Sequence, residues 1–552
     1  MEQASITAKF DPLSDQVAFP RLDDSEMAQV ALFGERCSFR QREPLVSAGQ
    51  YPFHSYVILC GQIRVIDVST EEPTVFVRYG AGYFTGDIDL FTGRPSVVTC
   101  EAETSVEAIR LTCERLRELF VHRVDLGQRF WKSYQRRREL LLESNFRGLS
   151  VYGSKNDKQT LDAVELLFRN KVPHHWFDTS LAENAVSLQR LQSYVKQYPV
   201  IALGQKFICE APTRTQLAQL AGLRRKLPDK IYDALILGAG PAGLGAAVYA
   251  ASEGLSTLVM DSLGPGGQAG SSSRIENYAG FPNGIAGREL AHLSYLQALK
   301  FGADFVAPST VSSIVRRTDG GYCVGTTEGD CVTGKTVVIA TGVSYGSLNV
   351  TGLDALRGAG IHYNATKVEA LLCRGTQIHI VGAGNSAGQA AMFLSRFAQG
   401  VSLLVRGDSL KVSKYLAQRL LANKKIEIRY RTEVACVEGN EHIEAVCLRD
   451  ENGTMTREAT SGLYVFIGGK PRTNFLPAAI AKDEFDFVLT GSAVASNSLW
   501  KEDRLPFALE TSLPGIFACG DCRSGTTKRV AFAIGDGAFV VTGIQEVLRM
   551  HR

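Results

Sequence analysis

The alternation of apolar and polar residues takes three forms along the 552-residue chain. Between about 19 and 143, short apolar runs of β type alternate with glycine turns, which predicts a small β-roll. A helix at 24–33 and a long amphipathic helical tract at 113–143 flank these strands. The segment 149–222 follows the order β-α-β-α-β-β-α, and from 230 onward apolar strands precede small-residue helices. The pattern therefore predicts several α+β and α/β domains in one chain.

The composition is that of an ordinary globular protein, with 45% hydrophobic and 21% charged residues. A net charge of +3 shows no bias toward nucleic acid or a membrane, so neither is an expected partner. No apolar run predicts a membrane helix, and the start at Met1 lacks the apolar core of a secretion signal. The 12 cysteines are scattered, as is typical of reduced cytosolic thiols. We therefore expect a cytoplasmic protein, and no metal site is predicted.

Two glycine-rich turns carry the strongest chemical signal in the chain. Each follows an apolar strand, at 232–237 and at 377–381, and each opens a small-residue helix. In this context the glycines make a tight turn and let a pyrophosphate approach the helix N-terminus. The first turn comprises Gly238, Gly240 and Gly243, and the second comprises Gly382, Gly384, Asn385 and Ser386. Two such turns predict two bound dinucleotides, with electrons passing between them.

The residue after the second strand of each unit predicts which dinucleotide binds. Asp261 ends the strand after the first turn, and an acid there accepts hydrogen bonds from a ribose diol. Arg406 ends the corresponding strand after the second turn, with Lys411 close by, and cations there suit a 2′-phosphate. Asp408 lies between them and weakens this signal. The first site is therefore expected to bind FAD and the second NADPH.

Part of the β-roll, at 59–65 and 80–90, resembles a cyclic-nucleotide-binding domain. In that family an acid after a glycine binds the ribose hydroxyl, which Gly86 and Asp87 fit. An arginine usually binds the cyclic phosphate, but here Ser96 occupies its position and Arg94 lies two residues earlier. A phosphate without a charged partner is poorly held. The alternative is a regulatory or docking roll that has lost or altered its ligand.

The segment 149–222 resembles a thioredoxin or glutaredoxin module, in which Pro199 would be the family's cis proline. The position of the family's dithiol, at 153–156, holds no cysteine. Disulfide exchange requires a thiolate nucleophile, so a structural or docking role is expected. The arginines at 136–138, just before this module, are expected to form a solvated helix face.

The part from Lys230 to the C-terminus resembles the low-molecular-weight thioredoxin reductases, in a bacterial multidomain branch with a cyclic-nucleotide-like N-terminal domain. Besides the glycine turns, four segments match that family, at 266–282, 338–342, 515–521 and 528–531. The resemblance implies a homodimer with FAD and NADPH as cofactors. Beyond the first turn and Asp261, the implied FAD contacts are Gly267, Gln268, Asn277, Gly342, Asp521, Arg529, Val530 and Ala531.

The redox-active dithiol of that family is missing from this sequence. In the family it follows a tyrosine, and the segment after Tyr363 has Asn364 and Lys367 in place of the two cysteines. Cys519 and Cys522 form another C-x-x-C pair, which is a second candidate for a working dithiol. Two buried thiols that pack as small apolar groups are the favoured interpretation of that pair. No catalytic residue is therefore assigned.

Together these motifs predict a multidomain chain with a cyclic-nucleotide-binding-like α+β roll at 1–148, followed by a thioredoxin-like α/β module and linker at 149–229. Two Rossmann-type α/β domains complete it, because the FAD-binding domain, at 230–349 and 471–552, encloses an NADPH-binding domain at 350–470. The expected activity passes a hydride from NADPH to FAD and on to an unidentified acceptor, either a small molecule or a docked protein. One alternative is a thioredoxin-disulfide reductase that uses other cysteines or an external thiol. The other is a non-enzymatic redox or nucleotide sensor.

Overall fold

The computed structural model of the chain describes residues 9–67, 74–143, 148–155, 157–181, 184, 195–203, 206–224, 229–272, 274–318, 320–346, 348–353, 356, 359–363, 365, 370, 372–440 and 442–550. The chain divides into two compact units. The first unit holds residues 1–155, 162–226 and 299–305, and the second holds residues 156–161, 227–298 and 306–552. The first unit therefore contains the β-roll and most of the thioredoxin-like module.

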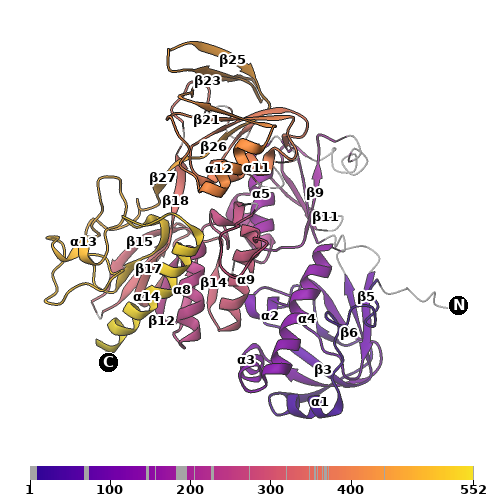
Figure 1. Cartoon of the computed structure of the whole chain (residues 1–552). Helices are drawn as coiled ribbons and strands as arrows, with labels where there is room; N and C mark the ends of the chain where they lie inside the picture. Colours follow the sequence, from indigo (N-terminus) through magenta and orange to yellow (C-terminus); the bar gives the residue numbers. More distant parts are fainter. Residues whose placement is uncertain are drawn as a thin grey trace. The chain divides into compact units, whose positions relative to one another are not determined.

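The β-roll consists of two antiparallel sheets, with strand orders β1-β7-β3 and β2-β6-β4-β5 (Figure 1). The strands are β1 (Glu35–Phe39), β2 (Pro44–Val46), β3 (Ser55–Cys60), β4 (Gln62–Asp67), β5 (Thr74–Gly80), β6 (Thr99–Ala102) and β7 (Val106–Leu111). The helices are α1 (Asp24–Ala31), α2 (Asp89–Thr92), α3 (Cys113–His122) and α4 (Val124–Glu143). The predicted single helical tract is thus two helices, because Arg123 leaves helical geometry at φ −134° and ψ 75°.

Aromatic side chains of α4 close the roll. Phe84 stacks on Phe130 with ring centroids 4.0 Å apart, and Tyr134 meets Phe84 edge-on. The prediction of a solvated arginine face is wrong for two of the three arginines, since Arg137 and Arg138 expose only 8% and 4% of their surface. They follow Tyr134 by three and four residues, so they lie on the same buried face of the helix.

The thioredoxin-like module has a four-stranded sheet in the order β11-β10-β8-β9. Its elements are β8 (Leu149–Gly153), α5 (Lys158–Arg169), β9 (His174–Asp178), β10 (Val200–Leu203), β11 (Lys206–Glu210) and α7 (Arg214–Leu220). β8 and β9 run parallel, whereas β10 runs antiparallel to both β8 and β11. The Tyr198–Pro199 peptide bond is cis, as the sequence predicted. The helix predicted at 181–197 falls mostly outside the described residues.

The second unit contains most strands of a seven-stranded sheet in the order β14-β13-β12-β17-β16-β15, with β28 beside β17. Its strands are β12 (Ile231–Leu237), β13 (Thr257–Met260), β14 (Asp304–Val306), β15 (Val311–Arg316), β16 (Tyr322–Thr326), β17 (Cys331–Ile339) and β28 (Ile516–Ala518). β12, β13, β17 and β28 run parallel, so their carboxyl ends share one edge of the sheet. A strand from near the C-terminus thus completes the sheet that β12 begins. The helices of this part are α8 (Pro241–Ser252), α9 (Gly287–Lys300), α13 (Ser492–Ala495) and α14 (Val530–Met550).

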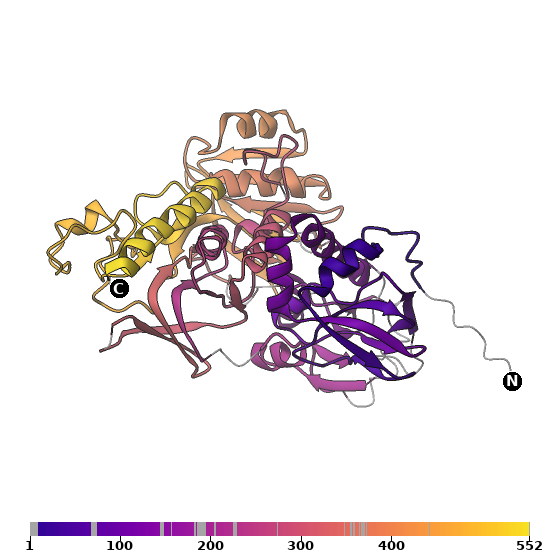
Figure 2. The same ribbon diagram turned by 90° about the horizontal axis from the view of Figure 1, so that it is seen from below.

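Helix α14 packs along α8 (Figures 1 and 2). The approach is close, since a Cβ added to Gly537 would lie 2.1 Å from the carbonyl oxygen of Ala242. Among the described helices, α14 is the one long and apolar enough to cross a membrane, and 33% of its apolar window is buried. The expectation of no membrane helix stays a prediction, because length and composition alone do not test it. A core helix meets the same criterion, and the packing on α8 is of that kind.

A five-stranded parallel sheet, in the order β19-β26-β20-β21-β22, lies between the two parts of this first sheet in the chain. Its elements are β19 (Ile361–His362), β20 (Gln377–Val381), α11 (Asn385–Leu394), β21 (Gly400–Val405), α12 (Lys414–Ala422), β22 (Ile426–Tyr430) and β26 (Leu463–Val465). An antiparallel meander of β23 (Glu433–Gly439), β24 (Ile443–Arg449) and β25 (Met455–Ala459) is inserted in it. The antiparallel pair β18 (Val343–Gly346) and β27 (Ile467–Pro471) forms the two connections to the rest of the unit.

Two cysteine pairs are disulfide-bonded, contrary to the expectation of reduced thiols throughout. Cys323 and Cys331 join β16 to β17, and Cys436 and Cys447 join β23 to β24. Cys436 and Cys447 are directly opposite in the strand register. The register of the hairpin, and not a recognisable spacing in the sequence, brings each pair together.

Candidate functional site

The three glycines of the first turn have different surroundings. Gly238 has φ +114°, and a Cβ there would lie 2.4 Å from the carbonyl oxygen of Ala340. A Cβ on Gly243 would lie 1.8 Å from the carbonyl oxygen of Gly238, so this glycine lets α8 pack against the turn. A Cβ on Gly240, the N-cap of α8, would meet no described atom nearer than the Cα of Gly267 at 3.8 Å. The space before the helix N-terminus therefore fits a pyrophosphate.

Asp261 follows β13, as predicted, and its carboxylate holds the backbone of the site. It accepts hydrogen bonds from the N–H groups of Ala239 at 2.8 Å, Leu263 at 2.9 Å and Gly264 at 2.8 Å. A carboxylate offers about four lone-pair positions, so one remains for a ribose hydroxyl. Asp261 thus fixes the shape of the glycine turn, a role that the sequence pattern does not reveal.

The loop after Asp261 folds against the first turn. The N–H of Gly266 donates to the carbonyl oxygen of Ala239 at 2.8 Å, and Gly267 has φ +53°. The Nε2 of Gln268 donates to the carbonyl oxygen of Val343 at 2.6 Å, which ties the loop to β18. Gln268 therefore positions the loop, while Asn277 is exposed.

The remaining predicted FAD residues lie at the carboxyl ends of β17 and β28 and at the start of α14. Gly342 has φ +62°, and its carbonyl oxygen accepts a hydrogen bond from the N–H of Arg472. Asp521 is half-buried, and burial raises the pKa of its carboxyl group. It accepts no hydrogen bond from the described residues, so it fits the hydroxyl groups of a ribityl chain. Arg529 immediately precedes α14, and Val530 and Ala531 begin it.

The second turn repeats the geometry of the first. Gly382 has φ +146°, and a Cβ there would lie 2.5 Å from the carbonyl oxygen of Phe466. A Cβ on Gly384, the N-cap of α11, would meet no described atom within 4 Å. Asn385 accepts a hydrogen bond from the N–H of Ser413 at 2.9 Å, and Ser386 is exposed on the first turn of the helix. This N-terminus therefore also has room for a pyrophosphate.

The two predicted cations lie near this second turn. Arg406 follows β21 directly and is exposed. The backbone of Lys411 forms a parallel bridge with Gly384, and its N–H donates to the carbonyl oxygen of Ala383 at 2.7 Å. This contact fixes the root of the Lys411 side chain beside the glycine turn. The arrangement suits a dinucleotide with an additional phosphate on its ribose.

Asn364 and Lys367 lie outside the described residues. Cys519 and Cys522 are described, and both are free thiols with no exposed surface. Burial raises the pKa of the Cys519 thiol well above its usual range and that of Cys522 to about 11. The Sγ of Cys522 donates to the carbonyl oxygen of Ile339 at 3.4 Å. Neither sulfur is therefore a thiolate near neutral pH, as the favoured interpretation holds.

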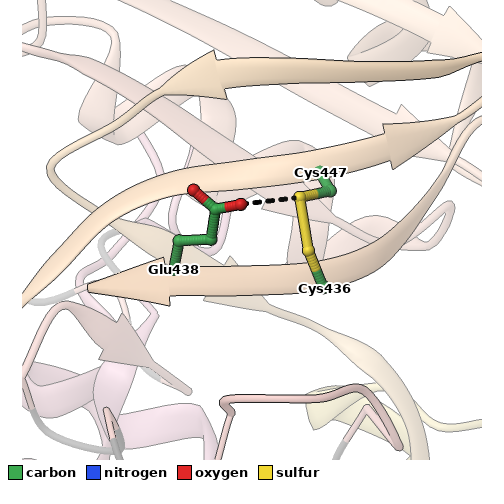
Figure 3. A group of neighbouring side chains, drawn as sticks. All are labelled: Cys436, Glu438 and Cys447. Carbon is green, nitrogen blue, oxygen red and sulfur yellow. Dashed lines mark hydrogen bonds between the residues drawn. A yellow bond between two sulfur atoms is a disulfide. The ribbon is translucent and has the colours of Figure 1, made fainter. Parts of the chain in front are cut away.

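The disulfide of Cys436 and Cys447 has a carboxylate beside it (Figure 3). Oε1 of Glu438 lies 3.4 Å from the Sγ of Cys447. Within the described chain, Cys436, Glu438 and Cys447 are the one group of possible metal ligands that lie close enough together to hold an ion. The two sulfurs are bonded to each other, so neither is a thiolate ligand. In Figure 1, β23 lies at the end of the second unit opposite to β12. This disulfide is thus remote from the first glycine turn.

In the β-roll, the side chains proposed to bind a cyclic nucleotide have protein partners. Asp87 accepts hydrogen bonds from Arg138 at 2.5 Å and from the N–H of Asp89 at 2.9 Å. Ser96 donates to the carbonyl oxygen of Val98 at 2.8 Å. Arg94 donates to the backbone carbonyl of Asn170 in the thioredoxin-like module. The predicted ribose acid is therefore ion-paired, and the neighbouring arginine binds elsewhere.

Gly86, Asp87 and Ser96 line a pocket of the roll together with Arg137, whose Nη1 donates to the carbonyl oxygen of Gly86 at 2.9 Å. Arg137 and Arg138 were not predicted to be site residues, because consecutive charged side chains are usually solvated. Their spacing from Phe130 and Tyr134 in the helical period was the signal that could have placed them on the buried face.

Two families match the sequence. Residues 232–537 match the family described as pyridine nucleotide-disulphide oxidoreductase. Residues 36–123 match the cyclic nucleotide-binding domain family. The first match covers both glycine turns, and the second covers most of the β-roll.

Several thioredoxin reductases are similar to the C-terminal part of the chain. That of Treponema pallidum is 34% identical over 308 residues, which is 56% of this chain and 94% of the relative. That of Bacillus subtilis is 31% identical over 319 residues, which is 57% of this chain and 95% of the relative. The crystal structure of Lactococcus lactis thioredoxin reductase, in its FR conformation, superposes on this chain with a TM-score of 0.52 and a sequence identity of 28%. The match covers 58% of this chain and 99% of the Lactococcus lactis chain.

Proposed function

The chain belongs to the pyridine nucleotide-disulphide oxidoreductase family, and on this basis we propose that it is an NADPH-dependent FAD oxidoreductase. The observation that carries the proposal is the pair of glycine turns, each of which leaves a helix N-terminus open. A Cβ atom added to Gly240 would lie no closer than 3.8 Å to any described atom. A Cβ atom added to Gly384 would have no described atom within 4 Å. Each of these N-termini offers backbone N–H groups and the positive end of a helix dipole to a pyrophosphate.

The two nucleotides are assigned by the side chains around each turn. FAD would be held at the first turn, with Asp521 accepting from its ribityl hydroxyls and the N-terminus of α14 facing its ring system. NADPH would be held at the second turn, with Arg406 and Lys411 beside its 2′-phosphate. When bound, the flavin accepts a hydride from the nicotinamide and passes the electrons on. The chain supplies the positions and the charges for that transfer.

The proposed acceptor is not reached through the usual dithiol, because positions 364 and 367 are Asn and Lys. Disulfide exchange requires a thiolate, and Cys519 and Cys522 are fully buried thiols. We therefore propose a small-molecule acceptor or a docked protein that takes electrons from the flavin directly. We also propose a cytoplasmic homodimer, which the resemblance to the low-molecular-weight thioredoxin reductases implies.

A second candidate is a thioredoxin-disulfide reductase, which the names of the similar proteins favour. An NADPH oxidation assay with a panel of acceptors separates the two. We expect rapid turnover with ferricyanide or a quinone and little turnover with thioredoxin or dithiobis-nitrobenzoate. Robust thioredoxin reduction would contradict the first proposal, and a Cys519→Ser, Cys522→Ser variant would then show whether those sulfurs carry it. A flavin that NADPH fails to reduce would leave the third possibility, a non-enzymatic sensor.

A further inference from the structure

The β-roll contains a cavity that neither glycine turn accounts for. Its empty space is about 620 Å³ when the open mouth of the cavity is included. The lining is mostly apolar, and its aromatic members are Phe10, Phe19, Phe53, Phe76 and Tyr79. Such a lining binds the apolar body of a ligand through burial of surface and contacts between rings.

One cationic side chain of this cavity has an unused donor. Arg137 exposes 8% of its surface. Its Nε donates a hydrogen bond to the carbonyl oxygen of Ala18 at 2.8 Å, and its Nη1 donates one to the carbonyl oxygen of Gly86 at 2.9 Å. Its Nη2 is buried and has no hydrogen-bond partner within the described chain. The guanidinium also lies over the ring of Phe84, 4.8 Å from its centroid. A buried donor without a partner is costly, so an acceptor from a ligand would be favourable here.

Among the residues that the structure describes, Arg137 has no ion pair with a carboxylate. The two nearby acids, Asp87 and Asp89, both bind Arg138, whose side chain is 5% exposed. Within the described part of the chain, the charge of Arg137 therefore faces backbone carbonyls and aromatic rings. A ligand carboxylate would supply the missing charged partner through a charge-assisted hydrogen bond.

The same cavity suits a cyclic nucleotide poorly. The acid for its ribose, Asp87, is already bound to Arg138, and Ser96 at the phosphate position donates to a backbone carbonyl instead. Arg94 is held by Asn170. The polar edges of a nucleoside would face the apolar lining without partners, at a substantial cost.

We propose that the β-roll binds a small organic acid with an apolar, preferably aromatic, body and a single carboxylate that pairs with Nη2 of Arg137. The ligand is thus of a different chemical class from cyclic nucleotides. The proposal concerns the first unit alone and does not depend on the oxidoreductase function proposed for the second.

Calorimetry on the full chain with its cofactors tests this with 2-naphthoate, octanoate and cyclic AMP. We expect saturable binding of the two acids, stronger for the aromatic one, and at least about tenfold weaker binding of methyl 2-naphthoate, which lacks the charge. Cyclic AMP should neither bind tightly nor displace the acids. Equal binding of the acid and its ester, no saturable binding of either acid, or tighter binding of cyclic AMP than of both acids would overturn the proposal.

Two variants locate the site. Arg137→Met should weaken 2-naphthoate binding at least about tenfold. Arg136→Gln is its matched control, because Arg136 is adjacent on α4 but pairs with Asp15 and does not line the cavity. Should Arg137→Met fail to fold, Val98→Trp decides, since Val98 lines the cavity and a larger side chain would occupy it. Unchanged binding in a folded Arg137→Met protein or in Val98→Trp overturns the assignment.

Discussion

At Gly240 a single side chain should decide whether the flavin binds. The residue is the N-cap of α8, and its missing Cβ leaves the space in which a pyrophosphate would lie. We expect Gly240→Val to weaken FAD binding by at least about tenfold, equivalent to ~1.4 kcal/mol, because the branched side chain would fill that space. The measurement is the flavin content after reconstitution. Gly468→Val is the control, because a Cβ at Gly468 would also have no described atom within 4 Å. Full flavin content in the Gly240→Val protein would contradict the assignment of the FAD site to this turn.

Arg406 should set the preference for NADPH over NADH. Charge-assisted hydrogen bonds contribute ~1.5–3 kcal/mol each, so Arg406→Ala should reduce the ratio of kcat/KM for the two donors about ten- to hundredfold. Flavin reduction by each donor, followed in stopped flow, measures this. Arg449→Ala removes a similarly exposed arginine, paired with Glu433 in the meander, and should leave the ratio unchanged. A wild-type protein that uses both donors equally would contradict the assignment.

Single residues also show the limit of prediction from sequence. The pattern placed Gly238 and Gly240 in the turn and Asp261 at the end of the next strand, because strand, glycine spacing and helix are all local features. It did not reveal that Asp261 accepts three backbone N–H groups. Nor did it show that Asp87 pairs with Arg138, which lies 51 residues away in the sequence. Such pairings depend on how distant elements pack.

At the scale of elements, the short helix after β28 buries Cys519 and Cys522 against β17. We expect both thiols to resist dithiobis-nitrobenzoate in the native protein and to react after unfolding, because burial raises both pKa values and blocks access. A Cys519→Ser, Cys522→Ser variant should therefore lose titratable thiols only in denaturant. Cys522→Ser should lower the free energy of unfolding by ~1–3 kcal/mol, since a buried hydroxyl replaces an apolar sulfur. Rapid native labelling that disappears in the variant would show a reactive pair.

Strand β20 carries a buried histidine that should make stability depend on pH. The side chain of His379 has no exposed surface and contacts Glu458 at 3.0 Å, and burial lowers its pKa below the usual 6.5. The unfolded chain therefore binds a proton below about pH 6.5 that the folded chain does not, so stability should fall as the pH drops through that range. The pKa of Glu458 is lowered by its partners Arg429 and His379 despite partial burial, which acts in the same direction at lower pH.

The melting temperature of the wild-type protein should thus fall between pH 7.5 and pH 5.5, and by less in His379→Gln. Glutamine does not titrate and retains a donor for Glu458. His442→Gln, in the hairpin between β23 and β24, is the control and should behave as wild type. An identical pH dependence in wild type and His379→Gln would show that His379 does not contribute.

For the whole molecule, the two strand–turn–helix units were predictable, and long-range pairing was not. Two such units in one chain predict two dinucleotide-binding sheets, and the cis bond before Pro199 was implied by the resemblance to the thioredoxin family. The disulfides of Cys323 with Cys331 and Cys436 with Cys447 were missed, because a hairpin's register is not visible in cysteine spacing.

The expected homodimer can be tested on α14. Phe532 and Phe539 expose 54% and 56% of their surface and, seven residues apart, lie on one face of the helix. Large exposed aromatic side chains of this kind are typical of an interface, and we expect a second copy of the chain to cover them. Phe539→Glu should place a charge in that interface and shift the protein toward monomer, as measured by sedimentation velocity over a concentration series. Phe485→Glu changes a side chain that is 67% exposed in a loop and should leave the assembly intact. A wild-type monomer, or a dimer that only Phe485→Glu dissociates, would show that α14 is not the contact surface.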